Sequence, residues 1–326
     1  MAQEKPYDFV PFPSGVSRRK PEGHARFVHL TGTLEVTLVA HRPVQVASGF
    51  LDVVTVQGQE VVVAQGTRRG RVHILPGSSL KGAVRSLVEA LSPSCVRVAG
   101  GRSRKALPAP LAPCSDADRL CPACRLFGMS GRGKENYGGQ VSVEDAVMVS
   151  GQPVLVRTPL LWAPARSPMG LPERYMAGDR AVGRKFYFHG TPARGTDARI
   201  AAGSGSVFET RIHFENLTEG ELGLLLAALG QHPGYPFLLK VGAGKPVGMG
   251  SLEVRLRGVR LAGEIRSGGR AGAGGQYLTG EPLAEAVQEW VRAAGESGLL
   301  DGEALEEVHR ILRRENLSRP SPEGPY

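Results

Sequence analysis

The sequence predicts an α+β fold built around an antiparallel sheet, and three observations support this prediction. Several segments alternate apolar and polar residues and are rich in β-branched side chains, which is typical of strands. Two segments between them carry apolar residues at helical spacing next to capping signals. In chain order these elements run strand, helix, strand, strand, helix, strand, the ferredoxin-like (split βαβ) order that RNA-recognition modules share.

The first half of the chain supplies one strand, a hairpin and a helix. Residues 1–26 are rich in proline and charge and predict an extended arm that is not a packed element. The strand begins near residue 27, and the hairpin LDVVTVQGQEVVVAQG turns at Gly58. In ILPGSSLKGAVRSLVEALS, Ser78 or Ser79 can cap a helix. The apolar face of that helix carries Leu80, Val84, Leu87, Val88 and Leu91.

The second half completes the core, which spans residues 27–262. GGQVSVEDAVMVS predicts one strand, and residues 151–205 predict a long irregular insertion rich in proline and glycine. VFETRIHFEN predicts the next strand, followed by a helix with Thr218 and Glu221 in capping-box spacing. SLEVRLRGVRL predicts the last strand, and the C-terminal segment 276–326 contains two amphipathic helices.

The four cysteines favour a metal site. Three of them lie in CSDADRLCPACRLFG, where the last two form a C-x-x-C pair, and the fourth lies upstream. Disulfides suit short secreted chains, and buried free thiols are the plain alternative. Four thiolates make a closed tetrahedral zinc site with a structural role. The predicted ligands are Cys95, Cys114, Cys121 and Cys124.

The charge distribution favours a polyanionic partner. The net charge of the chain is +9, yet residues 281–326 alone carry −5. Between residues 60 and 110 there are nine basic residues and two acidic ones. A block of this kind is the electrostatic signature of nucleic-acid binding, although it can also be a solubilising surface.

Two motifs predict phosphate contacts. PGSSLKGAVR places Ser78, Ser79, Lys81 and Arg85 on the first turns of a helix, where free N–H groups and the helix dipole favour an anion. The alternative is a plain capped helix. VGAGKPVGMGSL surrounds Lys245 with glycines that let backbone approach a ligand. The predicted contacts in this loop are Gly242, Gly244, Lys245 and Gly248.

These motifs, together with CPACRLFG leading into GGQVSVEDA, resemble the RAMP superfamily of CRISPR-associated proteins. Within it, the chain is similar to backbone subunits of type III effector complexes. PYDFVPFP and GRKFYFHG resemble one branch of these subunits, and Arg184 and Lys185 in the second motif are plausible RNA contacts. The resemblance covers about residues 6 to 260.

The resemblance implies a ferredoxin-like palm that grips the backbone of CRISPR guide RNA. It implies a thumb that wedges into the guide–target duplex, for which residues 151–205 are the candidate. It places the zinc-binding insertion, about residues 95–128, after the first helix. The implied partners are guide RNA, target RNA and other CRISPR effector subunits, with targets chosen by base pairing.

Related subunits cleave target RNA with an aspartate in the loop before PGSS, often with Mg²⁺ or another divalent ion. Here that loop holds Asp52 and Glu60, and Asp52 is the first candidate. The alternatives are a surface role for Asp52, a stand-alone CRISPR RNA-processing endoribonuclease, and a non-catalytic zinc-stabilised scaffold. The opening residues lack an apolar signal region and no stretch is long enough to span a membrane, so we expect a cytoplasmic protein.

Overall fold

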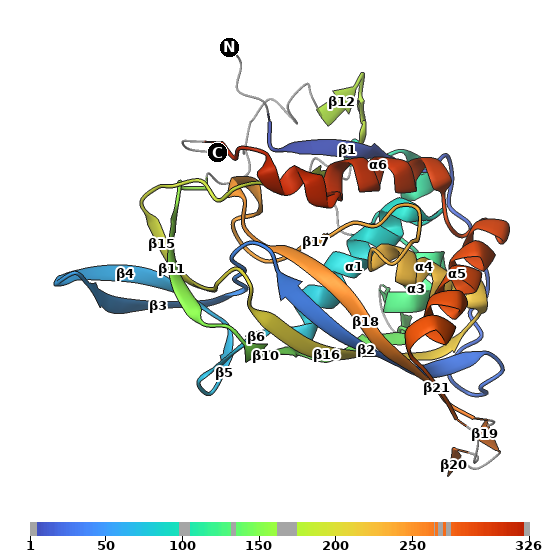
Figure 1. Cartoon of the computed structure of the whole chain (residues 1–326). Helices are drawn as coiled ribbons and strands as arrows, with labels where there is room; N and C mark the ends of the chain where they lie inside the picture. Colours follow the sequence, from blue (N-terminus) through green and yellow to red (C-terminus); the bar gives the residue numbers. More distant parts are fainter. Residues whose placement is uncertain are drawn as a thin grey trace.

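The computed structural model describes residues 5–97, 105–131, 135–161, 175–263, 265–266, 270–271 and 275–322. Its centre is a curled main sheet whose strands run in the order β17-β18-β2-β16-β10-β6-β5, with β21 beside β18 and β9 beside β16 (Figure 1). The bounds are β17 Leu239–Lys240, β18 Ser251–Leu261, β2 Leu30–Ala40, β16 Val207–Leu217, β10 Ala146–Ser150, β6 Val72–Leu75, β5 Arg68–Arg69, β21 Gln276–Leu278 and β9 Val141–Val143.

The central strands pair antiparallel. β2 lies between β16 and β18, with Leu34 opposite both Ile212 and Val259. Side chains alternate between the two faces of each strand, so one face of β2 carries Leu34, Val36 and Leu38 into the core, where each is at most 2% exposed.

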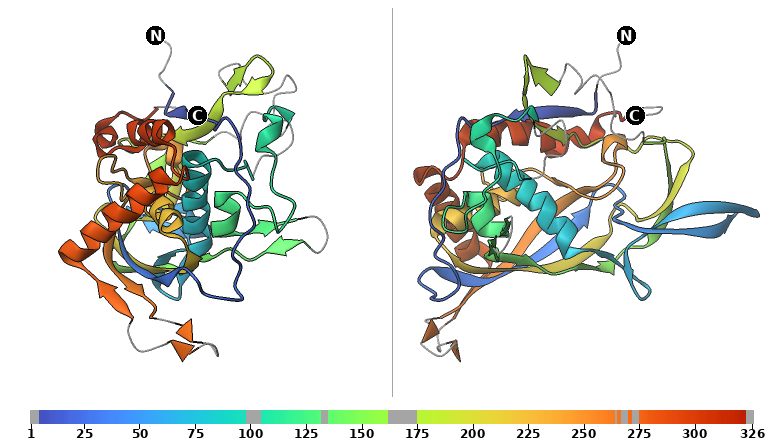
Figure 2. Two further views of the ribbon diagram at one scale, coloured as in Figure 1. Left: turned by 90° about the vertical axis from the view of Figure 1, so that its right-hand side faces the viewer. Right: turned by 180° about the vertical axis from the view of Figure 1, so that it is seen from behind.

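Helices cover one face of this sheet (Figures 1 and 2). They are α1 (Gly77–Leu91), α3 (Pro122–Phe127), α4 (Glu219–Ala228), α5 (Gly280–Glu296) and α6 (Gly302–Leu312). The five residues predicted for the apolar face of α1 are all buried. α4 begins at the predicted capping box, in which the Thr218 side chain accepts from Glu221 N and the Glu221 carboxylate accepts from Thr218 N. Both C-terminal helices form where the sequence predicts them.

The prediction that Ser78 or Ser79 caps α1 is wrong. Pro76 is the N-cap residue, and the carboxylate of Asp145 accepts from the backbone N–H of Gly77 at 2.9 Å. Asp145 lies in the break between β9 and β10, so the segment predicted as a single strand is two. A side chain at position 77 would meet the carbonyl oxygen of Val143, which explains why a glycine is needed at this close approach.

A second sheet has the order β11-β15-β4-β3. β3 (Ala47–Val56) and β4 (Gln59–Gly66) form the predicted hairpin, which turns at Gln57 and Gly58 with positive φ at both residues, as a type I′ turn requires. The tip of this hairpin projects from the body of the molecule (Figure 1). β11 (Pro153–Thr158) and β15 (Asp197–Ala202) brace its base.

The insertion 151–205 is therefore more ordered than predicted. Its two ends are the paired strands β11 and β15, and β14 (Gly183–Tyr187) pairs with β1 (Tyr7–Pro11). Residues 162–174 of the insertion lie outside the described residues. The N-terminal arm is extended, but the prediction that it is not a packed element is wrong, since Tyr7 and Val10 are buried.

The remaining elements are short. They are the strands β7 Met129–Ser130, β8 Asn136–Tyr137, β12 Met176–Ala177, β13 Arg180–Ala181, β19 Ile265–Arg266 and β20 Arg270–Ala271, and the 3₁₀ turns η1 Ala109–Leu111, η3 Lys245–Val247 and η4 Arg314–Ser318. In the described part of the chain, no helix has the length and apolarity needed to cross a bilayer.

The packing of α4 on α5 yields a stability prediction. A Cβ at Gly223 of α4 would lie 1.8 Å from the carbonyl oxygen of Trp290, whereas a Cβ at Gly295 of α5 meets nothing within 4 Å. We expect Gly223→Ala to lower the free energy of unfolding by about 2–3 kcal/mol through overpacking. Gly295→Ala, the matched control, should raise it by about 0.5–1 kcal/mol. Urea denaturation measures both, and equal effects of the two variants would contradict this packing.

Candidate nucleic-acid interface and metal centre

The four cysteines form one buried cluster beside the end of α1. Cys95 follows that helix, Cys114 lies in the next loop, Cys121 is the N-cap residue of α3, and Cys124 lies within α3. Each is at most 3% exposed, and the four sulfur atoms lie within 4.8 Å of one another. None of the four forms a disulfide.

The cluster fits a tetrahedral metal ion. Metal–sulfur bonds of about 2.3 Å require sulfur–sulfur edges of roughly 3.8 Å. The Cys95 sulfur lies 3.7 Å from that of Cys124 and 3.6 Å from that of Cys121. The guanidinium of Arg85 donates to the Cys124 sulfur at 3.4 Å, and the N–H of Cys121 donates to the Cys114 sulfur. Such donors stabilise thiolates, so these residues can hold a metal such as zinc.

A separate cavity of about 420 Å³ lies between α1, β14 and the glycine-rich loop. It brings together Ser79, Lys185, Gly242 and Lys245, four predicted phosphate or RNA contacts from three distant segments. Lys240, which the sequence analysis missed, also lines it. No carboxylate is among the described residues that line this cavity, so its charge is positive. The other lining residues are Gly82, Ala83, Ser86, Leu87, Phe186, Tyr187, Val241 and Leu312.

Lys240 is the most unusual charged group of the cavity. Its side chain is buried, and among the described residues its Nζ donates one long hydrogen bond, 3.4 Å to the Ser251 hydroxyl. Burial, and then the nearby charges of Arg42 and Lys245, lower the pKa of Lys240 to about 7. In the sequence it is marked only by its position just before the glycine-rich loop, and the structure places it at the end of β17.

The two neighbouring lysines differ in their surroundings. Burial lowers the pKa of Lys245. Burial also acts to lower the pKa of Lys185, but hydrogen bonding to Tyr175 and Tyr187 outweighs it and the pKa is raised. The Lys185 ammonium lies 4.7 Å from the ring centre of Tyr7 and 2.9 Å from the Tyr175 hydroxyl, which hold it at the cavity wall.

The glycine-rich loop owes its shape to left-handed backbone. Gly242 has φ +84°, and a Cβ there would lie 2.2 Å from the carbonyl oxygen of Gln45. Gly244 and Gly248 flank η3 in the same left-handed region, but neither is among the residues that line the cavity. Gly244 and Gly248 therefore shape the turn that positions Lys245 and do not themselves face the cavity.

Four other predicted contacts lie outside the cavity lining. Ser78 is exposed, and Lys81 is partly buried with a pKa lowered by burial and by Arg85. Arg85 and Arg184 both form ion pairs with the buried carboxylate of Glu89. In the free protein these two arginines therefore hold α1 and β14 together.

The candidate carboxylates lie on the projecting hairpin. Asp52 pairs across the ladder with Val63, and Glu60 pairs with Thr55. Since side chains alternate along a strand, Asp52 and Glu60 point to opposite faces of the hairpin and cannot act together on one phosphate. Both side chains are exposed, and the Asp52 carboxylate accepts from the Gln65 amide at 3.1 Å.

An antiparallel sheet with helices on one face and a cation-lined cavity at its edge is a plan suited to holding a phosphate backbone. A family model for the RAMP superfamily matches residues 56–253, and the chain belongs to that superfamily. The match begins in the hairpin and ends in β18, so it includes the cysteine cluster and most of the cavity lining. Membership is consistent with CRISPR-associated RNA binding. No curated protein matches the chain.

The cysteine cluster predicts a bound metal. We expect about one equivalent of metal per purified chain, measured by inductively coupled plasma mass spectrometry. Cys121→Ser should lose the metal and about 3 kcal/mol or more of unfolding free energy, because binding energy at such a site is folding energy. Met129→Leu, a buried neighbouring change that conserves volume, should keep both. Metal-free protein with wild-type stability would contradict the prediction.

Proposed function

We propose that this chain is a CRISPR RNA-binding backbone subunit of a type III RNA-guided effector complex. One observation carries the proposal: three lysines of a RAMP protein line one cavity that no described carboxylate enters. Lysine ammonium groups bind phosphate as point charges, so the cavity suits the guide backbone and is indifferent to its sequence. The expected partners are guide RNA, target RNA and the other effector subunits, in the cytoplasm.

We assign the main sheet and its two core helices, α1 and α4, to the ferredoxin-like palm of such a subunit. The core elements follow one another as β2, α1, β9 with β10, β16, α4 and β18, and the sheet order is β18-β2-β16 with β9 and β10 next. This split βαβ arrangement, with both helices on one face, supports the assignment.

The thumb is proposed to be the β3–β4 hairpin, braced by the ends of the 151–205 insertion. One face of this hairpin exposes Leu51, Val53 and Val62, at 72%, 54% and 60% of their surface. These three apolar side chains are largely exposed to solvent in the free chain. They suit a wedge that enters a nucleic-acid duplex and separates base steps.

The metal in the cysteine cluster is proposed to be zinc. Four thiolates leave no open coordination position, so the ion is structural and takes no part in a reaction. It would fasten Cys114 and α3 to the segment that follows α1.

The first test measures RNA binding by fluorescence anisotropy as a function of salt and pH. Affinity should fall steeply with salt. RNA phosphate requires protonated Lys240, whose pKa is about 7 in the free protein, so affinity should fall above pH 7 by up to about tenfold per pH unit. Lys240→Met should weaken binding and remove this pH dependence. Lys20→Met, at an exposed lysine paired with Asp118, is the control and should change neither.

Binding that is insensitive to salt, or unchanged by Lys240→Met, would disprove the proposed interface. Cleavage of precursor RNA by the isolated protein would instead favour the stand-alone processing endoribonuclease. Absence of RNA binding altogether would favour a zinc-stabilised scaffold.

A second candidate function is target-RNA cleavage at Asp52, because its exposed carboxylate lies on the hairpin proposed to enter the duplex. We expect Asp52→Ala to keep RNA binding and to slow magnesium-dependent target cleavage by the assembled complex about 100-fold or more. Glu60→Gln, on the opposite hairpin face, is the matched control and should cut normally. If Asp52→Ala cuts at the wild-type rate, Asp52 is not catalytic and the subunit only holds RNA there.

A further inference from the structure

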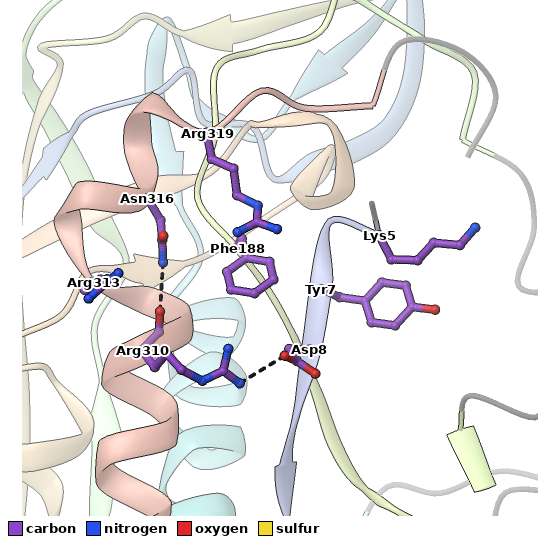
Figure 3. A pocket seen from close by; sticks show the side chains of 8 residues that line it. All are labelled: Lys5, Tyr7, Asp8, Phe188, Arg310, Arg313, Asn316 and Arg319. Carbon is purple, nitrogen blue, oxygen red and sulfur yellow. Dashed lines mark hydrogen bonds and ion pairs between the residues drawn. The ribbon is translucent and has the colours of Figure 1, made fainter. Parts of the chain in front are cut away.

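A second basic pocket lies between β1 and the end of α6, and it shares no lining residue with the cavity described above. Its volume is about 270 Å³. Segments from both ends of the described chain build it, with β1 on one wall and the end of α6 on the other (Figure 3). Pockets for small ligands span roughly 300–1,000 Å³, so this pocket is close to the lower end of that range and suits one small molecule.

Cations dominate the pocket. Lys5, Arg310, Arg313 and Arg319 line it, against the carboxylates of Asp8 and of Glu307 beside it. Arg310 donates to Asp8 at 3.0 Å and to Glu307, which holds its guanidinium in place. The adjacent Arg313 is exposed and has no ion pair to a described residue. The Arg313 guanidinium is therefore available to the oxygens of a phosphate group.

Three features distinguish this pocket from a simple anion site. The Arg319 guanidinium carbon lies 4.1 Å from the centre of the buried Phe188 ring (Figure 3). Guanidinium is a planar group on which nucleobases stack, so this pair can serve as a shelf for a base. The Asp8 carboxylate, which would repel a lone phosphate, still has lone pairs that can accept from ribose hydroxyls. Asn316 is anchored by its amide nitrogen to the carbonyl oxygens of Arg310 and Ile311, and its amide oxygen can accept from a base edge.

We propose that this pocket binds one phosphorylated nucleotide, with the phosphate on Arg313, the base on the Arg319–Phe188 shelf and the ribose at Asp8. The nucleotide is either free or the phosphorylated end of an RNA strand. This inference does not depend on the proposed guide-binding function, because the two pockets are separate.

Calorimetric titration of the full chain with AMP, adenosine and inorganic phosphate tests the proposal. AMP should bind at least about tenfold more tightly than either fragment, since it alone engages both the shelf and the cations. Arg313→Gln should weaken AMP binding about tenfold. The control Arg314→Gln, at the adjacent arginine that pairs with Glu253 instead, should leave it unchanged.

Arg319→Lys separates the two halves of the site. It keeps the charge but removes the planar group, so it should weaken AMP binding about fivefold and leave phosphate binding unchanged. Equal affinities for AMP and phosphate, or AMP binding that survives Arg313→Gln, would overturn the proposal.

The source of the nucleotide is identified with RNA oligonucleotides in the Lys240→Met background, where the guide cavity is impaired. Tighter binding of a 5′-phosphorylated strand than of its 5′-hydroxyl twin would assign the pocket to an RNA end. AMP binding without that preference would assign it to free nucleotide. If neither AMP nor either RNA strand binds this pocket, while the wild type still binds RNA in a salt-dependent way, the nucleotide-site proposal is rejected and the guide-binding proposal is unaffected.

Discussion

The candidate interface depends on one buried carboxylate, that of Glu89 near the end of α1. It accepts from Arg85 on its own helix, from Arg184 on β14, and from the backbone N–H of Arg97 beside the cysteines. These contacts join α1 and β14, which line the three-lysine cavity, and the residues beside the cysteine cluster to one group. Burial, and then repulsion by Arg85, lower the pKa of Arg184 to about 10, a sign of how much charge is confined there. Removing one partner of a buried pair leaves the other uncompensated and costs about 3–5 kcal/mol.

The three-lysine cavity is the opposite case, because no carboxylate among its described lining residues offsets the charge of Lys185, Lys240 and Lys245. The pKa of Lys240 is about 7 in the folded chain and about 10.4 when unfolded. Between these values the unfolded chain binds a proton that the folded chain does not, so stability rises as the pH rises from about 7 towards 10. Below pH 7 the folded protein bears the cost of a charged, buried amine. A phosphate bound in the cavity would offset that cost, so the electrostatics of the empty site favour an anion.

Local signals predicted most of the fold. Strand alternation, the helical face of α1 and the capping box of α4 each depend on residues close together in sequence, and all appear as expected. The failures are long-range. Asp145 caps α1 across 68 residues, and β14 pairs with β1 near the start of the chain. The same distinction holds for the candidate site. Its motif residues could be recognised in the sequence, but the directions in which their side chains point could not. Arg85 and Arg184 look like RNA contacts in sequence and turn inward to Glu89, while Lys240 had no motif to reveal it.

The two parts of the molecule to which we assign RNA binding and cleavage, the three-lysine cavity and the β3–β4 hairpin, differ in rigidity. The lysines that would grip the guide lie on elements packed into the core, so their positions are fixed before RNA arrives. Asp52 lies on a two-stranded ribbon whose outer part has few neighbours, and such a ribbon is marginally stable by itself. Asp52 points away from the exposed apolar face, so its carboxylate acquires a defined position relative to a phosphate only when the duplex fixes the ribbon as a whole. Under the proposed function, a firm grip on the guide would therefore precede any chemistry on the target, and base pairing would control cleavage by completing the geometry at the hairpin.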